Sequence, residues 1–194
     1  MSQRYDGGAR FFHWLFVLLF AAQVPAGLLM VVPAVNSDFE NLPGVEQHTI
    51  DLLYIFHKGM GAVLLVVVLA RLVWRIFHRP PPFPDTMPAL EQRIARQTHW
   101  AMYFLMVLAA VTGYVHVIGL GFPIELLNAL GVPPLLPKME RIAVIASFTH
   151  RFTTFVLSGV VAVHVAEVLR HHWIEKDGVM GRMWPPFGGG GAPR

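Results

Sequence analysis

The stretch IAVIASFTHRFTTFVLSGVVAVHVAEVL, residues 142–169, decides the fold, because it is long and apolar yet carries His150 and His164. About 20 apolar residues in a helix cross the hydrocarbon core of a bilayer. The two histidines lie 14 residues apart, so on a helix they point within roughly 40° of each other and lie about 21 Å apart along the axis. Ionisable side chains inside a membrane are rare and usually functional. We therefore prefer two stacked metal-centred cofactors to two unrelated polar residues.

The composition places the chain in a membrane. Its 194 residues are 55% hydrophobic and 14% charged, with a mean hydropathy of +0.52, which is too apolar for an ordinary soluble domain. The net charge of +3 raises the alternative of nucleic-acid binding, but the basic residues flank apolar runs and form no basic domain. Without cysteine, disulfides, iron–sulfur clusters and covalently attached haem are excluded, and the ten histidines dominate the metal chemistry.

Four apolar runs predict four membrane helices in a single domain over residues 1–194, at about 11–32, 52–77, 98–118 and 142–169, followed by a flexible tail at about 178–194. The first run contains Pro25, which should kink it. A signal peptide is the competing interpretation of that run, but the run is longer than a signal-peptide core. The segment 119–141 is rich in Pro and Gly and should hold a short surface helix at 124–130. The expected fold class is all-α, an integral membrane four-helix bundle.

The basic residues predict the orientation of the bundle. With a cytoplasmic N-terminus, eleven basic residues fall inside and four outside, which satisfies the positive-inside rule. Both termini are therefore expected on the cytoplasmic side of the membrane. The inner set is Arg4, Arg10, Arg71, Arg75, Arg79, Arg93, Arg96, Arg170, Lys176, Arg182 and Arg194, and the outer set is Lys58, Lys138, Arg141 and Arg151.

The same topology sorts the histidines by depth, with His13, His99 and His164 in an inner layer and His57, His116 and His150 in an outer one. Imidazole suits iron, copper, zinc and nickel. Two bis-histidine haems, stacked across the bilayer, are the economical solution, because a zinc or copper site would need three or four ligands in one layer. A proton relay is the other alternative. His171, seven residues after His164, is a fallback ligand, and Gly59 and Gly61 beside His57 serve either close helix packing or a flat macrocycle.

The chain contains the motifs Phe12-His13-Trp14, Phe56-His57-Lys58-Gly59-Met60-Gly61, and Thr149-His150 through His164 to His171-His172-Trp173, with Lys176-Asp177 following. Together these motifs resemble the bacterial cytochrome b561 family of di-haem b-type membrane cytochromes, and the resemblance implies a location in the bacterial inner membrane. The resemblance implies non-covalent haem b held by His13 and His164 on the cytoplasmic side. It likewise implies a second haem b held by His57 and His150 on the periplasmic side.

The resemblance also implies a function, namely electron transport between a periplasmic donor and ubiquinone. Some members resemble superoxide oxidases, which would make superoxide the donor and the chain an oxidoreductase; others are haem-containing anchor subunits of hydrogenases or dehydrogenases. Lys58 and Arg151 follow the proposed outer ligands directly, and Arg71 lies near the inner end of its helix. These three cations are expected to neutralise haem propionates. The alternative for Arg71 is an ordinary cytoplasmic anchor, and a further role expected of Lys58 and Arg151 is to attract a small anionic donor. The sequence assigns no roles to His99 and His116.

Overall fold

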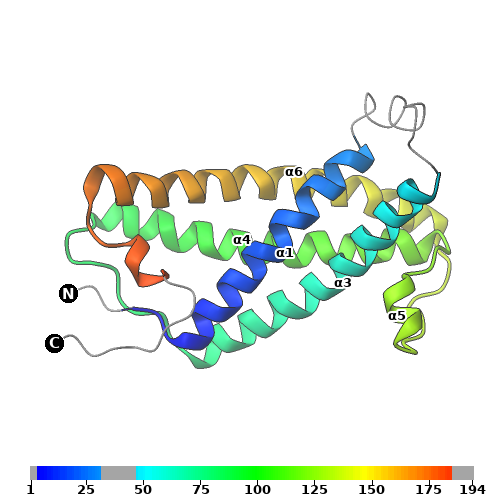
Figure 1. The fold of residues 1–194 in the computed structure, drawn as a ribbon, viewed down its shortest axis with the longest axis horizontal. Helices are drawn as coiled ribbons and strands as arrows, with labels where there is room; N and C mark the ends of the chain where they lie inside the picture. Colours follow the sequence, from blue (N-terminus) through cyan, green and yellow to red (C-terminus); the bar gives the residue numbers. More distant parts are fainter. Residues whose placement is uncertain (1–3, 32–46, 185–194) are drawn as a thin grey trace. The chain divides into compact units, whose positions relative to one another are not determined.

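Every regular element in the described part of the computed structural model, residues 4–31 and 47–184, is helical (Figure 1). Four long helices, α1 (Gly7–Val31), α3 (Gln47–Phe77), α4 (Ala89–Gly119) and α6 (Glu140–Arg170), follow one another along the chain. The short elements are α5 (Glu125–Ala129), a π-helical turn η1 (His171–Glu175) and a 3-10 turn η2 (Met180–Arg182). The all-α prediction is confirmed, and so is the short helix after α4.

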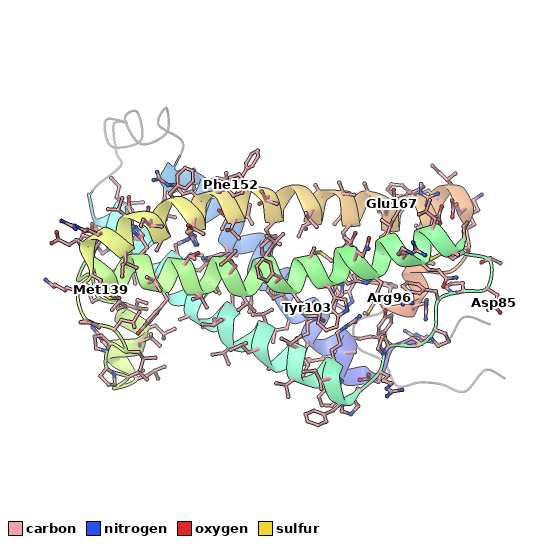
Figure 2. The ribbon with its side chains drawn as sticks, turned by 180° about the vertical axis from the view of Figure 1, so that it is seen from behind. Asp85, Arg96, Tyr103, Met139, Phe152 and Glu167 are labelled. Carbon is pink, nitrogen blue, oxygen red and sulfur yellow. The ribbon has the colours of Figure 1, made fainter. Side chains whose placement is uncertain are left out.

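All four long helices are long and apolar enough to cross a membrane, as their spans Gly7–Met30, His48–Phe77, Ala89–Gly119 and Glu140–Glu175 show. Large apolar side chains cover their surfaces. Leu18 is 70% exposed and Phe155 80% exposed, and Figure 2 shows Phe152 projecting away from α6. Such continuous apolar surface is stable against lipid and not against water.

The helices extend beyond the apolar runs that predicted them. The predicted starts at 11, 52 and 98 correspond to observed starts at Gly7, Gln47 and Ala89. Hydropathy detects only the part of a helix that lies in lipid, whereas the backbone hydrogen bonds continue into the polar region. At α4 the true start follows Pro88, whose carbonyl accepts from Gln92 N–H at 3.0 Å.

Hydroxyl groups within the spans bond to their own helices. Thr112 donates to the Leu108 carbonyl at 2.6 Å, Thr149 to the Ile145 carbonyl at 2.9 Å and Ser158 to the Thr154 carbonyl at 2.8 Å. In hydrocarbon an unpaired hydroxyl would cost several kcal/mol. Each therefore meets the carbonyl one turn back, which is the acceptor that needs no other helix.

The chain forms two compact units, each built from parts of all four long helices. The first comprises the described residues within Met1–Phe16, Val67–Val107 and Thr153–Arg194. In it the indole of Trp14 donates to the Met183 carbonyl at 3.0 Å, and the buried Arg182 guanidinium donates to the Pro82 carbonyl at 2.6 Å. These contacts include residues up to 184 of the tail; residues 185–194 lie outside the described part, and the flexibility of the tail stays a prediction.

The second unit comprises the described residues within Val17–Val66 and Leu108–Phe152. Here α4 and α6 pack closely, because a Cβ on Gly119 would lie 2.9 Å from the Cβ of Ala143, which is fully buried. The connection between these helices turns at Gly121, whose φ of +84° favours glycine. Tyr114 fixes the same connection by accepting a hydrogen bond from Leu135 N–H at 2.9 Å. The connection between α1 and α3, residues 32–46, lies outside the described residues.

Candidate functional site

His57 on α3 and His150 on α6 lie next to each other in the second unit. Their ring centroids are 6.2 Å apart and their planes meet at 87°. A metal–imidazole bond is about 2 Å long, so two imidazoles that share one metal ion have centroids roughly 6 Å apart. The two rings therefore have the spacing that a common metal centre requires.

Hydrogen bonds set the orientation of this pair. The Nδ1 of His150 lies 2.7 Å from the Ala109 carbonyl on α4. A carbonyl can only accept, so this contact assigns the proton to Nδ1 and leaves Nε2 as the metal-binding atom. The Nδ1 of His57 is buried with no hydrogen-bond partner among the described residues. The backbone at His57 is held by Gln23 of α1, whose Nε2 donates to the His57 carbonyl at 3.0 Å.

Two glycines make room for the two imidazoles. A Cβ on Gly27 of α1 would lie 3.0 Å from Cε1 of His57, and a Cβ on Gly113 of α4 would lie 3.0 Å from Cε1 and Nδ1 of His150. The glycines next to His57 in sequence do something else. A Cβ on Gly59 would meet Leu126 of α5 at 3.4 Å, and one on Gly61 would meet Gln23 at 3.5 Å, so both serve close packing.

The first unit brings together the other histidines of the predicted pattern. The ring centroids of His99 on α4 and His164 on α6 lie 5.5 Å apart at 69°. His13 of α1 lies within electrostatic range of both rings and of Arg71, and its buried Nδ1 has no hydrogen-bond partner among the described residues. The two units thus divide the six histidines as the depth sorting predicted. The sequence placed His99 in the inner layer without a role, whereas in the structure its ring lies beside that of His164.

Arg71 lies in an aromatic and basic environment on α3. Its guanidinium is 5.5 Å from the Tyr103 ring centroid, and that of Arg75 is 5.5 Å from the Trp100 centroid, distances at which cation–π attraction operates. A recess of about 300 Å³, counting its open mouth, adjoins them. It is lined by Tyr5, Ala9, Arg71, Trp74, Arg75, His78, Pro80, Tyr103 and Met183. Arg71 is therefore placed to meet an anionic group, and its predicted propionate contact stays a prediction.

Lys58 and Arg151 differ in their surroundings. The Lys58 ammonium donates to Glu125 Oε1 and to the Pro123 carbonyl, both at 2.8 Å, which ties α3 to α5. Burial alone would raise the pKa of the Glu125 carboxyl, but the hydrogen bond from Lys58 and its charge lower it, so Glu125 is ionised at neutral pH. Arg151 is exposed on α6, directly after His150. Their predicted anion contacts remain untested.

His171 has partners of its own. Its Nδ1 lies 2.6 Å from Asp177 Oδ2 and 3.0 Å from Glu175 Oε2, within the segment that follows α6. His116, the third histidine of the second unit, has its Nδ1 3.2 Å from the Ala143 carbonyl. Gln23, Gly27 and Ala109 contact the His57–His150 pair, and sequence reasoning did not assign them to it. A polar residue inside an apolar run was the available signal for Gln23; nothing comparable marks a backbone carbonyl.

A comparison with known protein families shows to which family the chain belongs. The family model described as prokaryotic cytochrome b561 matches residues 4–186. The chain belongs to this family. It is also 28% identical over 183 residues to cytochrome b561 homolog 2 of Escherichia coli (strain K12), a match that covers 93% of this chain and 91% of that protein. The chain is thus a multi-pass membrane cytochrome of the b type, and its family implies haem b and electron transfer.

The residues present fit haem b. The His57–His150 pair offers two imidazoles at suitable spacing, one of them fixed in the tautomer that leaves Nε2 available. With no cysteine in the chain, attachment is non-covalent.

Proposed function

We propose that this cytochrome b561-family protein holds two haem b groups, one between His57 and His150 and one between His13 and His164, and carries electrons across the bacterial inner membrane. The donor is periplasmic, with superoxide as the favoured candidate, and the acceptor is the ubiquinone pool. The observation that carries the proposal is the neighbouring His57–His150 pair, whose ring centroids are 6.2 Å apart. The presence of His13 and His164 in the other unit supports the second haem.

The chain's own residues hold and tune the groups. Haem b supplies a one-electron couple at its iron when bound. His150 is oriented by its hydrogen bond to the Ala109 carbonyl, which also makes Nε2 a stronger ligand. Gln23 fixes the backbone of His57, and Gly27 and Gly113 let the rings approach their neighbouring helices. Arg71 supplies positive charge near His13, where it would offset a propionate.

Haem stoichiometry tests the ligand assignment. A pyridine-haemochrome assay on the purified protein should give two haems per chain, both six-coordinate and low-spin, because each has two strong-field imidazoles. Each alanine substitution at a proposed ligand should remove or perturb one haem, and His116→Ala should keep both. The proposed ligands are His13, His57, His150 and His164. One haem in the wild type would overturn the pairing.

His99→Ala separates the two ways of pairing the inner histidines. If His13 and His164 are the ligands, His99→Ala keeps two low-spin haems while His13→Ala does not. Because the His99 ring lies 5.5 Å from that of His164, the reverse result would assign His99 as the ligand in place of His13. Absorption and electron paramagnetic resonance spectra of both variants give the answer directly.

Electron flow is tested with the purified chain in proteoliposomes that contain a ubiquinone analogue. Superoxide generated outside should reduce the haems and then produce ubiquinol in the wild type, and loss of either haem should abolish ubiquinol formation. A chain that takes up two haems but reduces no quinone by itself contradicts an autonomous role. It would indicate the haem-containing anchor subunit of a hydrogenase- or dehydrogenase-type complex instead.

A further inference from the structure

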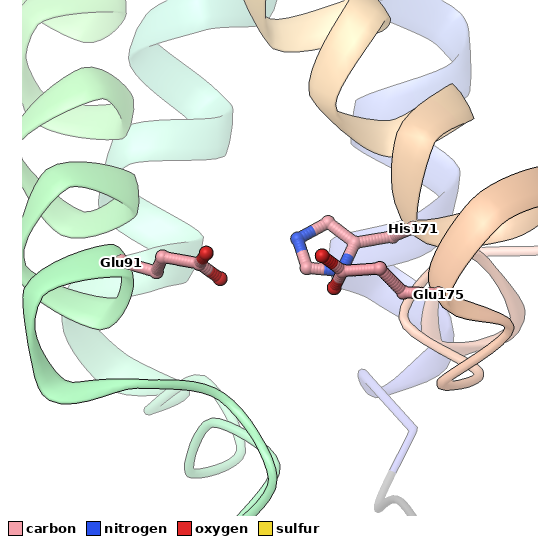
Figure 3. A group of neighbouring side chains, drawn as sticks. All are labelled: Glu91, His171 and Glu175. Carbon is pink, nitrogen blue, oxygen red and sulfur yellow. The ribbon is translucent and has the colours of Figure 1, made fainter.

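Glu91, His171 and Glu175 form a cluster outside the proposed haem ligands. Glu91 belongs to the first turn of α4, while His171 and Glu175 begin and end the π-helical turn η1. One ligand atom from each residue lies within 4.8 Å of the others. Figure 3 shows the Glu91 carboxylate and the His171 ring directed toward each other, with Glu175 beside the ring.

His171 has the surroundings of a metal-binding histidine. It is only 6% exposed. Its Nδ1 lies 2.6 Å from Asp177 Oδ2, and Asp177 is itself fixed because its Oδ1 accepts from Val179 N–H at 3.0 Å. A histidine that binds metal typically donates its other ring N–H to a carboxylate in this manner. The remaining ring nitrogen faces Glu91 (Figure 3).

Four carboxylates, those of Glu91, Glu167, Glu175 and Asp177, lie around Arg170 and His171. Arg170 contacts three carboxylates, those of Glu91 at 3.4 Å, Glu167 at 2.8 Å and Glu175. Glu175 and Asp177 also contact His171. In addition, Glu91 Oε2 is buried with no hydrogen-bond partner among the described residues. A buried carboxylate oxygen that accepts no bond is costly, and a cation beside it removes that cost.

We propose that Glu91, His171 and Glu175 bind one divalent transition-metal ion of the zinc class, with Asp177 orienting His171. One imidazole and two carboxylates suit Zn²⁺, which accepts nitrogen and oxygen ligands at about 2 Å and can complete its shell with water. Two ligands of a tetrahedral ion are then roughly 3.4 Å apart. Glu175 Oε2 lies 3.0 Å from the Nδ1 of His171, so Glu175 would turn from that nitrogen toward an ion held by Nε2. The Glu91 and Glu175 side chains are 34% and 32% exposed, which leaves them room to rotate.

The bound ion would compete with Arg170 for Glu91 and Glu175, and Arg170 would keep Glu167. It would also join the beginning of α4 to the turn that follows α6. Any ligand that binds only the folded state stabilises it by mass action. The site therefore predicts that metal raises the temperature at which this end of the fold opens.

The test uses the haem-loaded full chain without an affinity tag, stripped of adventitious metal with a chelator. Equilibrium dialysis against Zn²⁺ should show one tight equivalent in the wild type. Glu91→Gln and Glu175→Gln, which keep the side-chain shape, should each raise the dissociation constant by ~10-fold or more, and Asp177→Asn by about 10- to 100-fold. X-ray absorption at the zinc edge should report one imidazole and oxygen ligands.

Matched variants separate this site from other surface histidines and acids. His172→Gln, next to His171, and Glu167→Gln, which contacts only Arg170 among these residues, should leave the tight equivalent intact. Arg170→Gln removes the competing cation and should tighten zinc binding. Soret absorption verifies that each variant is folded. Absence of a stoichiometric zinc in the wild type, or equal binding in Glu91→Gln, Glu175→Gln and wild type, would overturn the proposal without bearing on the haem assignment.

Discussion

Gly113 leaves a gap in the surface of α4 into which the imidazole of His150 fits. The ring is held there from one side, because its Nδ1 lies 2.7 Å from the carbonyl of Ala109, one turn earlier on the same helix. A Cβ at position 113 would lie 3.0 Å from two atoms of the ring. The ring cannot move away from the new methyl group and keep its hydrogen bond.

Gly113→Ala is therefore expected to displace His150 and weaken one haem. The variant should show part of its haem as high-spin or should lose up to one equivalent, measured by electron paramagnetic resonance and pyridine haemochrome. Gly159→Ala is the control, because no atom lies within 4 Å of a Cβ there, and alanine favours a helix over glycine by about 1 kcal/mol. If Gly113→Ala and Gly159→Ala have the same spectra as the wild type, the proposed seat of His150 is wrong.

At this scale the sequence predicts residue types and depth better than partners. The positions of His13, His57, His150 and His164 near helix ends sorted them into the groups that the two units contain. The depth of a histidine in the membrane does not say toward which neighbouring helix its ring points. This explains why sequence reasoning assigned His99 no role although its ring lies 5.5 Å from that of His164. The hydrogen bond between His150 and the Ala109 carbonyl could not be predicted, since every residue has a carbonyl.

Among the elements, the apolar cores of the long helices were predictable and their polar ends were not. The first turns of α4 contain Glu91, Arg93 and Arg96, which hydropathy counts as loop. They remain helical because charged side chains can reach water from a helix that continues past the lipid. The short helix α5 was predictable because an apolar run stands between Pro- and Gly-rich segments.

The segment after α6 has contacts that its composition does not predict. A flexible tail at about 178–194 stays a prediction; within its described part, Arg182 is 4% exposed and donates to the carbonyls of Pro81 and Pro82. The consecutive prolines supply carbonyl acceptors but no backbone N–H donors, so these carbonyls are not paired within the run. Long-range contacts of this kind depend on how the chain folds back, which no local pattern encodes.

For the molecule as a whole, charge should determine which side of the membrane each connection faces. The connection between α3 and α4 belongs to the predicted inner side and the one between α4 and α6 to the outer side. The chain has no native cysteine, so single substitutions can be labelled cleanly. Thr86 and Val132 are exposed positions in these two connections.

We expect Val132→Cys to react with a membrane-impermeant maleimide once the outer membrane is permeabilised. Thr86→Cys should react only after the inner membrane is opened too, because the positive-inside rule keeps its connection in the cytoplasm. Retention of both haems serves as the control for native insertion. The opposite labelling pattern would reverse the orientation and with it the periplasmic assignment of the His57–His150 pair.

Whether positive charge attracts an anionic donor depends on the sum of charges around that pair. Lys58 is neutralised by Glu125 at 2.8 Å, and the lowered pKa of Glu125 keeps its carboxylate ionised at neutral pH. Arg151 is a second cation next to His150 on α6. A local positive potential raises the association rate of an anion, and salt screens it as the Debye length falls from about 10 Å at 0.1 M to about 3 Å at 1 M.

These charges predict an order of rates for haem reduction by superoxide at low salt. Glu125→Gln frees the charge of Lys58 and should be faster than the wild type, whereas Lys58→Gln leaves Glu125 negative and Arg151→Gln removes a cation, so both should be slower. The differences should shrink as salt is added. Four equal rates that are indifferent to salt would exclude steering and favour a protein donor.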